Sequence, residues 1–113
     1  MKQGEIWLIN LDPTIGAEIN KTRPAVIIND NQLGILPLKV IVPVTDWKDH
    51  YKVAPWMIAI EPSAKNGLLK KSAMDCFQIR SVSKTRLIKK IGQVGSADIL
   101  HIQEGVAKVV GLL

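Results

Sequence analysis

The sequence predicts a small, mainly β domain that is closed by one C-terminal helix. Its 113 residues are close to the commonest length of a single domain, so we expect one domain over residues 1–113. Short apolar runs rich in β-branched residues follow one another with turn-forming residues between them, which is typical of a small barrel. After Gly95 the apolar residues change from strand spacing to helical spacing.

The predicted strands are separated by glycines, prolines and an Asn-Gly pair, which favour turns for backbone reasons. Pro43 lies inside the third run. Because proline cannot donate a ladder hydrogen bond, Pro43 indicates an edge strand or a bulge there. The expected strands are Ile6–Leu11, Ala25–Asn29, Val40–Thr45, Met57–Glu61, Ala73–Arg80 and Leu87–Val94.

The last segment predicts an amphipathic helix. Ser96 is a suitable N-cap, and Asp98 lies in the first turn, where the helix dipole favours an acid. Gly105 weakens such a helix by about 1 kcal/mol relative to alanine. The apolar face suits a cover for the open end of a barrel, and its width also suits a dimer interface. This face is formed by Ile99, Ile102, Val106, Val109 and Leu113, with Leu100, Val110 and Leu112 beside them.

The composition limits the class of protein. Hydrophobic residues make up 47% of the chain, which predicts either a dense core or burial against a second subunit, because a small domain has a large surface. No apolar run is long enough to span a membrane, and the N-terminus lacks the layout of a secretory signal. A lone cysteine, Cys76, cannot form an intramolecular disulfide. We therefore expect a cytoplasmic protein.

The net charge of +5 is unevenly distributed. Residues 65–90 contain eight basic residues and one acid, Asp75, for a net charge of +7 in this segment. Clustered basic charge is expected for a protein that binds a polyanion. Charge alone leaves RNA, DNA and an acidic protein tail equally open, and a solvated lysine-rich face is the commoner explanation of such a run.

The first candidate site is the loop of residues 12–18, followed by the turn Lys21-Thr22-Arg23-Pro24. Pro24 fixes its own φ and favours an extended Arg23, which holds the Arg23 backbone where a loop meets a strand. The planar guanidinium suits a phosphate better than an ammonium does. A surface ion pair between Arg23 and Glu18 is an equally good explanation of this motif alone.

The second candidate is Thr45, which ends a buried strand. A threonine at a strand end more often makes a local backbone hydrogen bond than it takes part in chemistry. Thr45 therefore becomes a functional candidate only if the fold brings it beside Arg23.

The third candidate is the aromatic segment 46–56, which contains two of the three tryptophans and the only tyrosine. Single-stranded bases stack on such rings for ~1–3 kcal/mol each. The alternative is that these rings pack in the core, which is the better explanation for Trp56. His50 is the only histidine placed to meet a substrate, because His101 lies on the predicted helix.

The fourth candidate is the segment 67–82. At strand spacing Phe77 and Ile79 share one face, which suits a core, and Gln78 and Arg80 share the other, where they meet a ligand or solvent. Cys76 is expected to pack as a small hydrophobic residue. The chain has no phosphate-binding glycine loop and no metal-ligand spacing, so we expect no metal and no cofactor.

Seven segments share an order with one known family. They are Gly4-Glu5-Ile6-Trp7, Leu11-Asp12-Pro13-Thr14-x-Gly16-x-Glu18, Lys21-x-Arg23-Pro24, Val42-Pro43-Val44-Thr45, Gly67-Leu68, Gln78-Ile79-Arg80-Ser81-Val82 and Lys84-x-Arg86-Leu87-Ile88. Together they resemble the MazF/PemK family of toxin ribonucleases from type II toxin–antitoxin modules. The resemblance implies a CcdB/PemK-type barrel close to an SH3-like fold, working as a homodimer. It also implies metal-independent cleavage of single-stranded RNA and control by an acidic antitoxin.

The resemblance further implies that Arg23 and Thr45 are the catalytic residues. Where PemK-like members have a histidine in the first loop and an Arg-x-Asp pair, this chain has Ala17, Asp75 and Phe77, which favours the MazF-like variant built on arginine and threonine. The resemblance and the candidate segments above together indicate which residues are expected to contact RNA. These are Thr14, Gly16, Glu18, Lys21, Asp46, Trp47, His50, Tyr51, Gln78 and Arg80.

In the implied reaction the RNA 2′-hydroxyl attacks its own phosphate and leaves a 2′,3′-cyclic phosphate and a 5′-hydroxyl. We expect Arg23 to stabilise the developing charge and to donate the proton, because its guanidinium stays charged at neutral pH. Thr45 would hydrogen-bond a phosphoryl oxygen, and a solvent molecule or His50 would be the base. Two alternatives are a CcdB-like gyrase poison, disfavoured by a C-terminal segment without tryptophan, and a basic nucleic-acid-binding barrel without catalysis.

Overall fold

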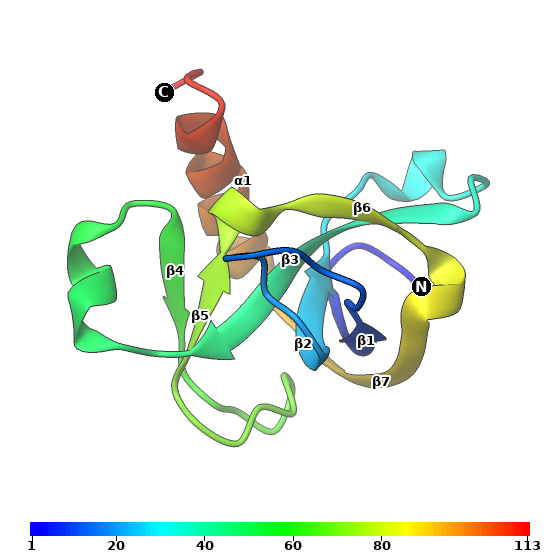
Figure 1. The fold of residues 1–113 in the computed structure, drawn as a ribbon, viewed down its shortest axis with the longest axis horizontal. Helices are drawn as coiled ribbons and strands as arrows, with labels where there is room; N and C mark the ends of the chain where they lie inside the picture. Colours follow the sequence, from blue (N-terminus) through cyan, green and yellow to red (C-terminus); the bar gives the residue numbers. More distant parts are fainter.

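The computed structural model describes residues 1–113 as seven strands followed by one helix (Figure 1). The strands are β1 (Glu5–Asn10), β2 (Thr22–Ile27), β3 (Leu38–Asp46), β4 (Met57–Ile60), β5 (Ser72–Asp75), β6 (Arg80–Ser83) and β7 (Leu87–Gln93), and the helix is α1 (Ser96–Val109). Four short 3₁₀ helices connect them: η1 (Asn31–Leu33), η2 (Asp49–Val53), η3 (Cys76–Gln78) and η4 (Lys84–Arg86). The prediction of a mainly β fold with one C-terminal helix is confirmed.

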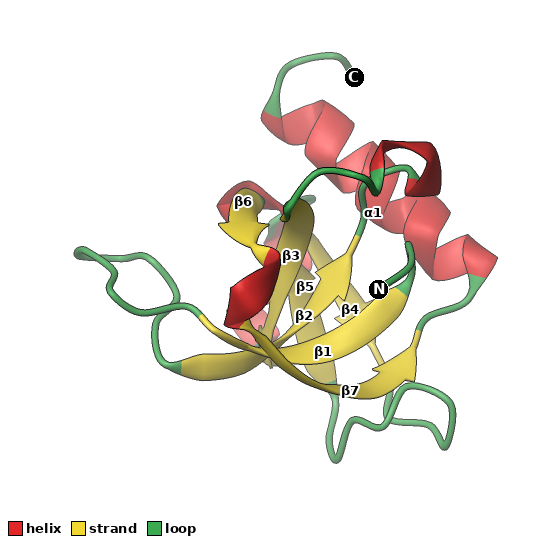
Figure 2. Ribbon diagram, turned by 90° about the vertical axis from the view of Figure 1, so that its right-hand side faces the viewer, coloured by secondary structure: helices red, strands yellow, loops and turns green.

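All strand pairs are antiparallel. Neighbouring strands follow the order β4-β5-β3-β2-β1-β7, and β6 also pairs with β3. The sheet is curved, and the helix lies against one side of it (Figure 2). No ladder joins β4 to β7, so the hydrogen bonding leaves the sheet open between these two strands. Closure into a barrel stays a prediction.

The predicted continuous strand Ala73–Arg80 is wrong, because η3 interrupts it. β5 pairs with residues 44–46 of β3 and β6 pairs with residues 38–41, so the two strands follow one edge of β3 with η3 between them. The carboxylate of Asp75 accepts a hydrogen bond from the Phe77 N–H at 3.1 Å and begins the 3₁₀ turn. This local cap competes with strand pairing, which the alternating sequence could not reveal.

Pro43 lies in the central strand β3, so its predicted place in an edge strand is wrong. The Ile28 N–H donates to Val40 O at 2.9 Å on the β2 side. By the alternation of antiparallel pairing, the nitrogen of residue 43 faces the opposite edge, beside the interruption between β5 and β6. The missing N–H of Pro43 therefore removes no hydrogen bond from the strand ladders.

Two apolar clusters occupy the two faces of the sheet. One lies between the sheet and α1 and includes Ile102 with Ile6, Val26, Val42 and Met74. The other lies on the opposite face and is formed by Ile9, Leu11, Ala25, Ile27, Ile41, Val82 and Leu87. The predicted cover of the sheet by the C-terminal helix is therefore present on one face.

The helix begins at Ser96, one residue earlier than predicted. Gly95, not Ser96, is the N-cap, and its N–H donates to the Asp98 carboxylate at 3.2 Å.

Gly105 lies where α1 crosses η3, and a Cβ added there would lie 2.8 Å from Sγ of Cys76. Cys76 itself is fully buried, as predicted, and burial raises the pKa of its thiol to about 12.

No helix has the length and apolar content that a membrane span requires.

Candidate functional site: the open end of strands β2 and β3

Arg23, the second residue of β2, has a guanidinium that is almost without partners. Its Nε donates to Asn20 O at 3.3 Å, and its two terminal nitrogens make no hydrogen bond and no ion pair. The alternative of an ion pair with Glu18 is wrong, because the Glu18 carboxylate instead accepts a hydrogen bond from the Ile15 N–H at 2.6 Å. The guanidinium is therefore free to bind an anion.

Thr45 lies near the end of β3, beyond its pairing with β2. The β2–β3 ladder pairs Ile27 with Ile41 and ends at Ala25 and Pro43, so Arg23 and Thr45 each lie two residues beyond the last pair, at the same end of the two strands. Both residues also alternate onto the face that carries Ala25 and Ile41. The Thr45 hydroxyl makes no local hydrogen bond, and its backbone pairs with Ala73 of β5. Thr45 thus lies at the same end of the sheet as Arg23, and its catalytic role stays a prediction.

Asp46 does not join this pair. As the next residue along β3 it alternates onto the opposite face, where it lines a cavity of about 350 Å³ with Pro24 and Leu68. Its carboxylate lies 3.0 Å from Nζ of Lys70. The side chain of this predicted RNA contact is therefore on the other side of the sheet from Arg23.

The loop between β1 and β2 is held by its own side chains. Asp12 Oδ1 accepts hydrogen bonds from the Lys21 N–H at 3.0 Å and the Thr14 hydroxyl at 3.4 Å. Lys21 has a positive φ of 65°, and no ion pair involves its ammonium group. Of the predicted RNA contacts in this loop, Thr14 and Glu18 thus hold the loop, and Lys21 and Gly16 are exposed at its surface.

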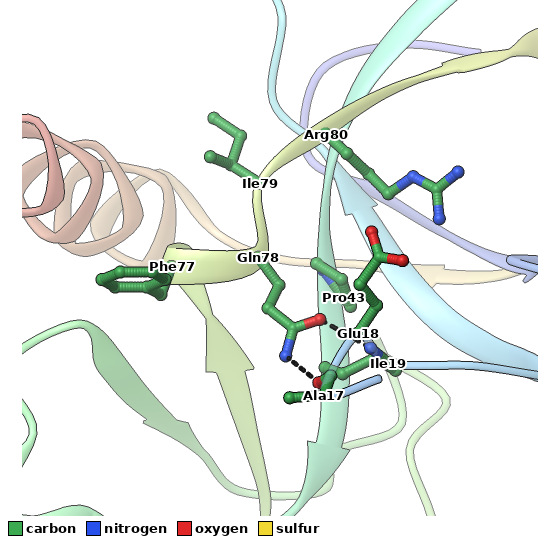
Figure 3. Close-up of a pocket in the computed structure, with 8 residues that line it drawn as sticks. All are labelled: Ala17, Glu18, Ile19, Pro43, Phe77, Gln78, Ile79 and Arg80. Carbon is green, nitrogen blue, oxygen red and sulfur yellow. Dashed lines mark hydrogen bonds between the residues drawn. The ribbon is translucent and has the colours of Figure 1, made fainter. Parts of the chain in front are cut away.

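Side chains of η3, β6 and η4 hold the same loop. Gln78 Oε1 accepts from the Ile19 N–H at 2.6 Å, and its Nε2 donates to Ala17 O at 3.1 Å (Figure 3). Arg80 Nη1 donates to Leu11 O at 3.2 Å. Arg86 Nη1 also donates to Asn10 O and Asp12 O, a role that no sequence pattern indicated. These partners are backbone atoms far away in the sequence, and no motif identifies them.

A cavity of about 430 Å³ lies between this loop and the η3–β6 segment. Figure 3 shows its lining: Ala17, Glu18, Ile19, Pro43, Phe77, Gln78, Ile79 and Arg80. Pro43 alternates onto the same face as Thr45, so the cavity lies next to the Arg23–Thr45 pair along β3. The prediction that Phe77 lies in the core is wrong, because η3 turns its ring outward to 62% exposure.

The aromatic residues of segment 46–56 divide into two groups. Tyr51 lies edge-on to Trp47 and His50, with ring centroids 5.7 and 4.7 Å away. The ammonium of Lys71 lies 4.7 Å from the Trp47 ring centroid, a cation–π contact. Trp56 instead packs against the apolar cluster under α1, as the alternative interpretation predicted.

No three His, Cys, Asp or Glu side chains come together in a group that could hold a metal ion.

A family model described as PemK-like, MazF-like toxin of type II toxin–antitoxin system matches residues 2–110. The chain belongs to this family. The family that the sequence motifs resemble is thereby confirmed.

Two relatives within the family are similar in sequence. The chain is 32% identical over 110 residues to Endoribonuclease MazF9 of Mycobacterium tuberculosis, covering 92% of this chain and 91% of that protein. It is also 32% identical over 96 residues to Endoribonuclease PemK of Escherichia coli, covering 83% of this chain and 70% of that protein.

Solved structures of toxins share the fold. MazF of Deinococcus radiodurans superposes with a TM-score of 0.80 at 17% identity, covering 98% of this chain and 96% of the other. A mycobacterial endoribonuclease in complex with its cognate antitoxin superposes with a TM-score of 0.77 at 20% identity, covering 100% and 97%. At these identities the likeness shows the MazF-like fold.

Asp75, the last residue of β5, is buried beside η3. The carboxyl group is 4% exposed and is occupied by the Phe77 N–H. Burial raises the pKa of Asp75 above its usual value, against the effect of the backbone hydrogen bonds that it accepts. Asp75 therefore caps η3, and this turn occupies its carboxylate.

Proposed function

We propose that this toxin is an endoribonuclease that cleaves single-stranded RNA at a short sequence without a metal ion. The observation that carries the proposal is the free guanidinium of Arg23 at the same end of the sheet as the free hydroxyl of Thr45. An anion-binding group and a neutral hydrogen-bond donor on one open face suit a phosphodiester in a single strand. The names of the two sequence relatives, both endoribonucleases, support the same activity.

The proposed reaction breaks one P–O bond and forms another. The RNA 2′-oxygen bonds to the adjacent phosphorus and its proton passes to a base, while the bond to the 5′-oxygen breaks and that oxygen receives a proton. Arg23 binds the phosphoryl oxygens, stabilises the extra negative charge and donates the proton to the leaving oxygen. Thr45 donates a hydrogen bond to a phosphoryl oxygen. Such preorganised donors are often the largest contribution to rate.

The base in this scheme is a solvent molecule or His50. His50 lies on η2 in edge-on contact with Tyr51 and is exposed. A rate that rises through the histidine range of pH and loses this rise in His50→Ala would identify His50. A flat profile near neutral pH, unchanged in His50→Ala, would assign the role to solvent.

Two protein partners belong to the proposal. Several large apolar side chains are exposed, including Leu33, Ile35 and Leu36 near η1, which supports burial in a homodimer. The net charge of +7 on residues 65–90 supports binding of an acidic antitoxin segment. A solved relative of the same fold is described in complex with its cognate antitoxin.

The deciding experiment is incubation of the protein with a long RNA in the presence of EDTA. Fragments that share one cut sequence and carry 5′-hydroxyl ends support the nuclease. Intact RNA that stays bound to the protein would instead favour a non-catalytic binding barrel, and inhibition of gyrase without RNA cleavage would favour a gyrase poison.

A further inference from the structure

One peptide group, between Asn20 and Lys21, connects the β1–β2 loop to the side chain of Arg23. Its carbonyl oxygen, which belongs to Asn20, accepts a hydrogen bond from Nε of Arg23 at 3.3 Å. Its N–H, which belongs to Lys21, donates to Oδ1 of Asp12 at 3.0 Å. Because a trans peptide group is planar and its C=O and N–H point in opposite directions, the Asp12 carboxylate fixes the direction of the carbonyl that holds Arg23.

Lys21 needs this support, because its backbone conformation is unfavourable for a lysine. Its φ of 65° lies in the left-handed region, which residues with a Cβ adopt rarely and keep only where the surrounding structure holds them. The Lys21 N–H is bound by Asp12, and its C=O accepts from the Leu11 N–H at 2.9 Å. Without the Asp12 carboxylate, Lys21 would be free to leave this conformation, and the peptide group before it would turn as well.

Arg86 holds the backbone of Asp12. Its Nη1 donates to the Asp12 carbonyl oxygen, so a side chain of η4 binds the main chain and the Asp12 carboxylate stays available for the loop. The hydrogen bonds thus form one series, from Arg86 through Asp12 and the N–H of Lys21 to the guanidinium of Arg23.

This arrangement holds Arg23 without neutralising its charge. Asp12 makes no ion pair with Arg23. A carboxylate bound directly to the guanidinium would offset its charge and occupy the terminal nitrogens, which form the fork that binds a phosphate. A neutral carbonyl bound to Nε does neither, so the side chain is oriented while its anion-binding end stays free.

The geometry points to Asp12 as the positioning residue for Arg23. Asp12 acts through the N–H of Lys21 and does not bind the phosphate itself. The inference rests on the proposed function and extends it, because it names the group that orients the anion-binding guanidinium. The role requires a hydrogen-bond acceptor and not a negative charge, so asparagine should replace Asp12 and alanine should not.

The first test observes Arg23 in the protein without RNA. In ¹⁵N-labelled protein the Nε–H of Arg23 gives one NMR signal, which is assigned by its loss in Arg23→Lys, and the Lys21 amide gives another. We expect both protons to exchange with water in Asp12→Asn as slowly as in the parent. In Asp12→Ala both should exchange roughly tenfold faster, because a hydrogen bond of ordinary strength corresponds to about that factor.

The matched control is Asp30→Ala. The Asp30 carboxylate makes the same kind of contact beyond the other end of β2, where it accepts from the Gln32 N–H at 2.8 Å and begins η1. Asp30→Ala therefore removes a comparable hydrogen bond and leaves the series to Arg23 intact. Both NMR signals should exchange in this variant as they do in the parent.

The second test separates the rate of cleavage from the affinity for RNA. Single-turnover reactions at increasing protein concentration give a maximal rate and a half-saturating concentration. Asp12→Ala should lower the maximal rate by about 10–10²-fold, the usual effect of a misplaced catalytic group. Its half-saturating concentration should hardly change, because the charge of Arg23 remains. Asp12→Asn and Asp30→Ala should cut as the parent does, whereas a loss of stability alone would affect Asp12→Ala and Asp30→Ala alike.

Certain results would overturn the inference. Unchanged exchange of the Arg23 Nε–H in Asp12→Ala does so, as does cleavage by this variant at the parental rate. If Asp12→Asn is as slow as Asp12→Ala while its Lys21 amide stays protected, the charge of Asp12 is required and the positioning role is wrong.

The inference and the proposed nuclease can fail separately. If the parent leaves RNA intact, the nuclease is refuted, and the two NMR signals still decide whether Asp12 positions Arg23. If Asp12→Ala does not fold, Arg86→Met takes its place, because it releases the Asp12 carbonyl and keeps an unbranched side chain. The same two signals should then exchange faster, and unchanged exchange would contradict the inference.

Discussion

Gln78 binds the backbone of Ile19 across 59 residues of sequence. Its side-chain oxygen accepts from the Ile19 N–H at 2.6 Å, and its nitrogen donates to Ala17 O at 3.1 Å. One amide thus satisfies a donor and an acceptor of the same loop. This loop forms one wall of the cavity beside Arg23 and Thr45, so the position of the wall depends on Gln78.

We predict that Gln78→Ala loosens the β1–β2 loop. Two hydrogen bonds are lost and the Ile19 N–H is left without its partner, so we expect a loss of about 1–2 kcal/mol in the free energy of unfolding. Hydrogen exchange at residues 15–20 should become faster, and RNA affinity should fall. Gln78→Glu keeps the acceptor for Ile19 but cannot donate to Ala17, so its effect should be intermediate. Unchanged exchange in Gln78→Ala contradicts this role.

Arg23→Ala should lower kcat for RNA cleavage by about 10²–10³-fold, the usual effect of removing a preorganised charge donor. Arg23→Lys keeps the charge and loses the planar fork, so its rate should lie between those of the parent and Arg23→Ala. The matched control is Lys89→Ala, an exposed cation on β7. Single-turnover cleavage of a mapped RNA site gives these rates. Cleavage by Arg23→Ala at the parental rate would remove Arg23 from the mechanism.

The sequence predicted most strands because their apolar residues alternate, whereas the roles of Arg23 and Thr45 came from the family resemblance and not from local features. Local features could not predict that both residues lie at the same end of the sheet, because strand register depends on loops whose shape has no simple pattern. The register of β2 on β3 supplies this relationship. For the same reason the partners of Gln78 and Arg80 were not predicted, since both bind backbone atoms of a distant loop.

The interruption at η3 shows another limit of sequence patterns. Residues 73–80 alternate as a strand does, yet Asp75 caps a 3₁₀ turn and Cys76 packs beneath Gly105. Tertiary packing of α1 thus overrides a local strand preference. The consequence for the site is large, because the ring of Phe77 changes from an expected core position to the surface.

Glu5 should make the protein sensitive to acid. Partial burial alone would raise its pKa, but hydrogen bonds from Trp7 Nε1 and the Lys2 N–H and the nearby amino terminus lower the pKa from 4.5 to about 2. Because the folded pKa lies below the unfolded value, the carboxylate stabilises the fold above pH 4.5, and this contribution is lost as the pH falls toward 2.

Glu5→Gln removes this titration, so its free energy of unfolding should fall less steeply than that of the parent between pH 4.5 and 2. The control is Glu61→Gln, whose side chain is 72% exposed beside Lys71 and should leave the slope unchanged. Urea unfolding at several pH values measures the slope. Parallel curves for Glu5→Gln and the parent would show that Glu5 titrates alike in the folded and unfolded chains.

Gly105→Ala should destabilise the protein even though alanine favours helices. Helix propensity alone would stabilise α1 by about 1 kcal/mol. The new methyl carbon, however, would lie 2.8 Å from Sγ and 3.3 Å from Cβ of Cys76, and overpacking of this kind costs about 1–3 kcal/mol. We therefore expect a lower free energy of unfolding in urea titrations, with Gln103→Ala on the exposed side of α1 as the control.

The double variant Gly105→Ala with Cys76→Ala tests the cause of this effect. Removing the sulfur makes room for the new methyl group, so the double variant should be more stable than the sum of the two single changes predicts. Strict additivity would mean that the glycine is not required by the contact with Cys76.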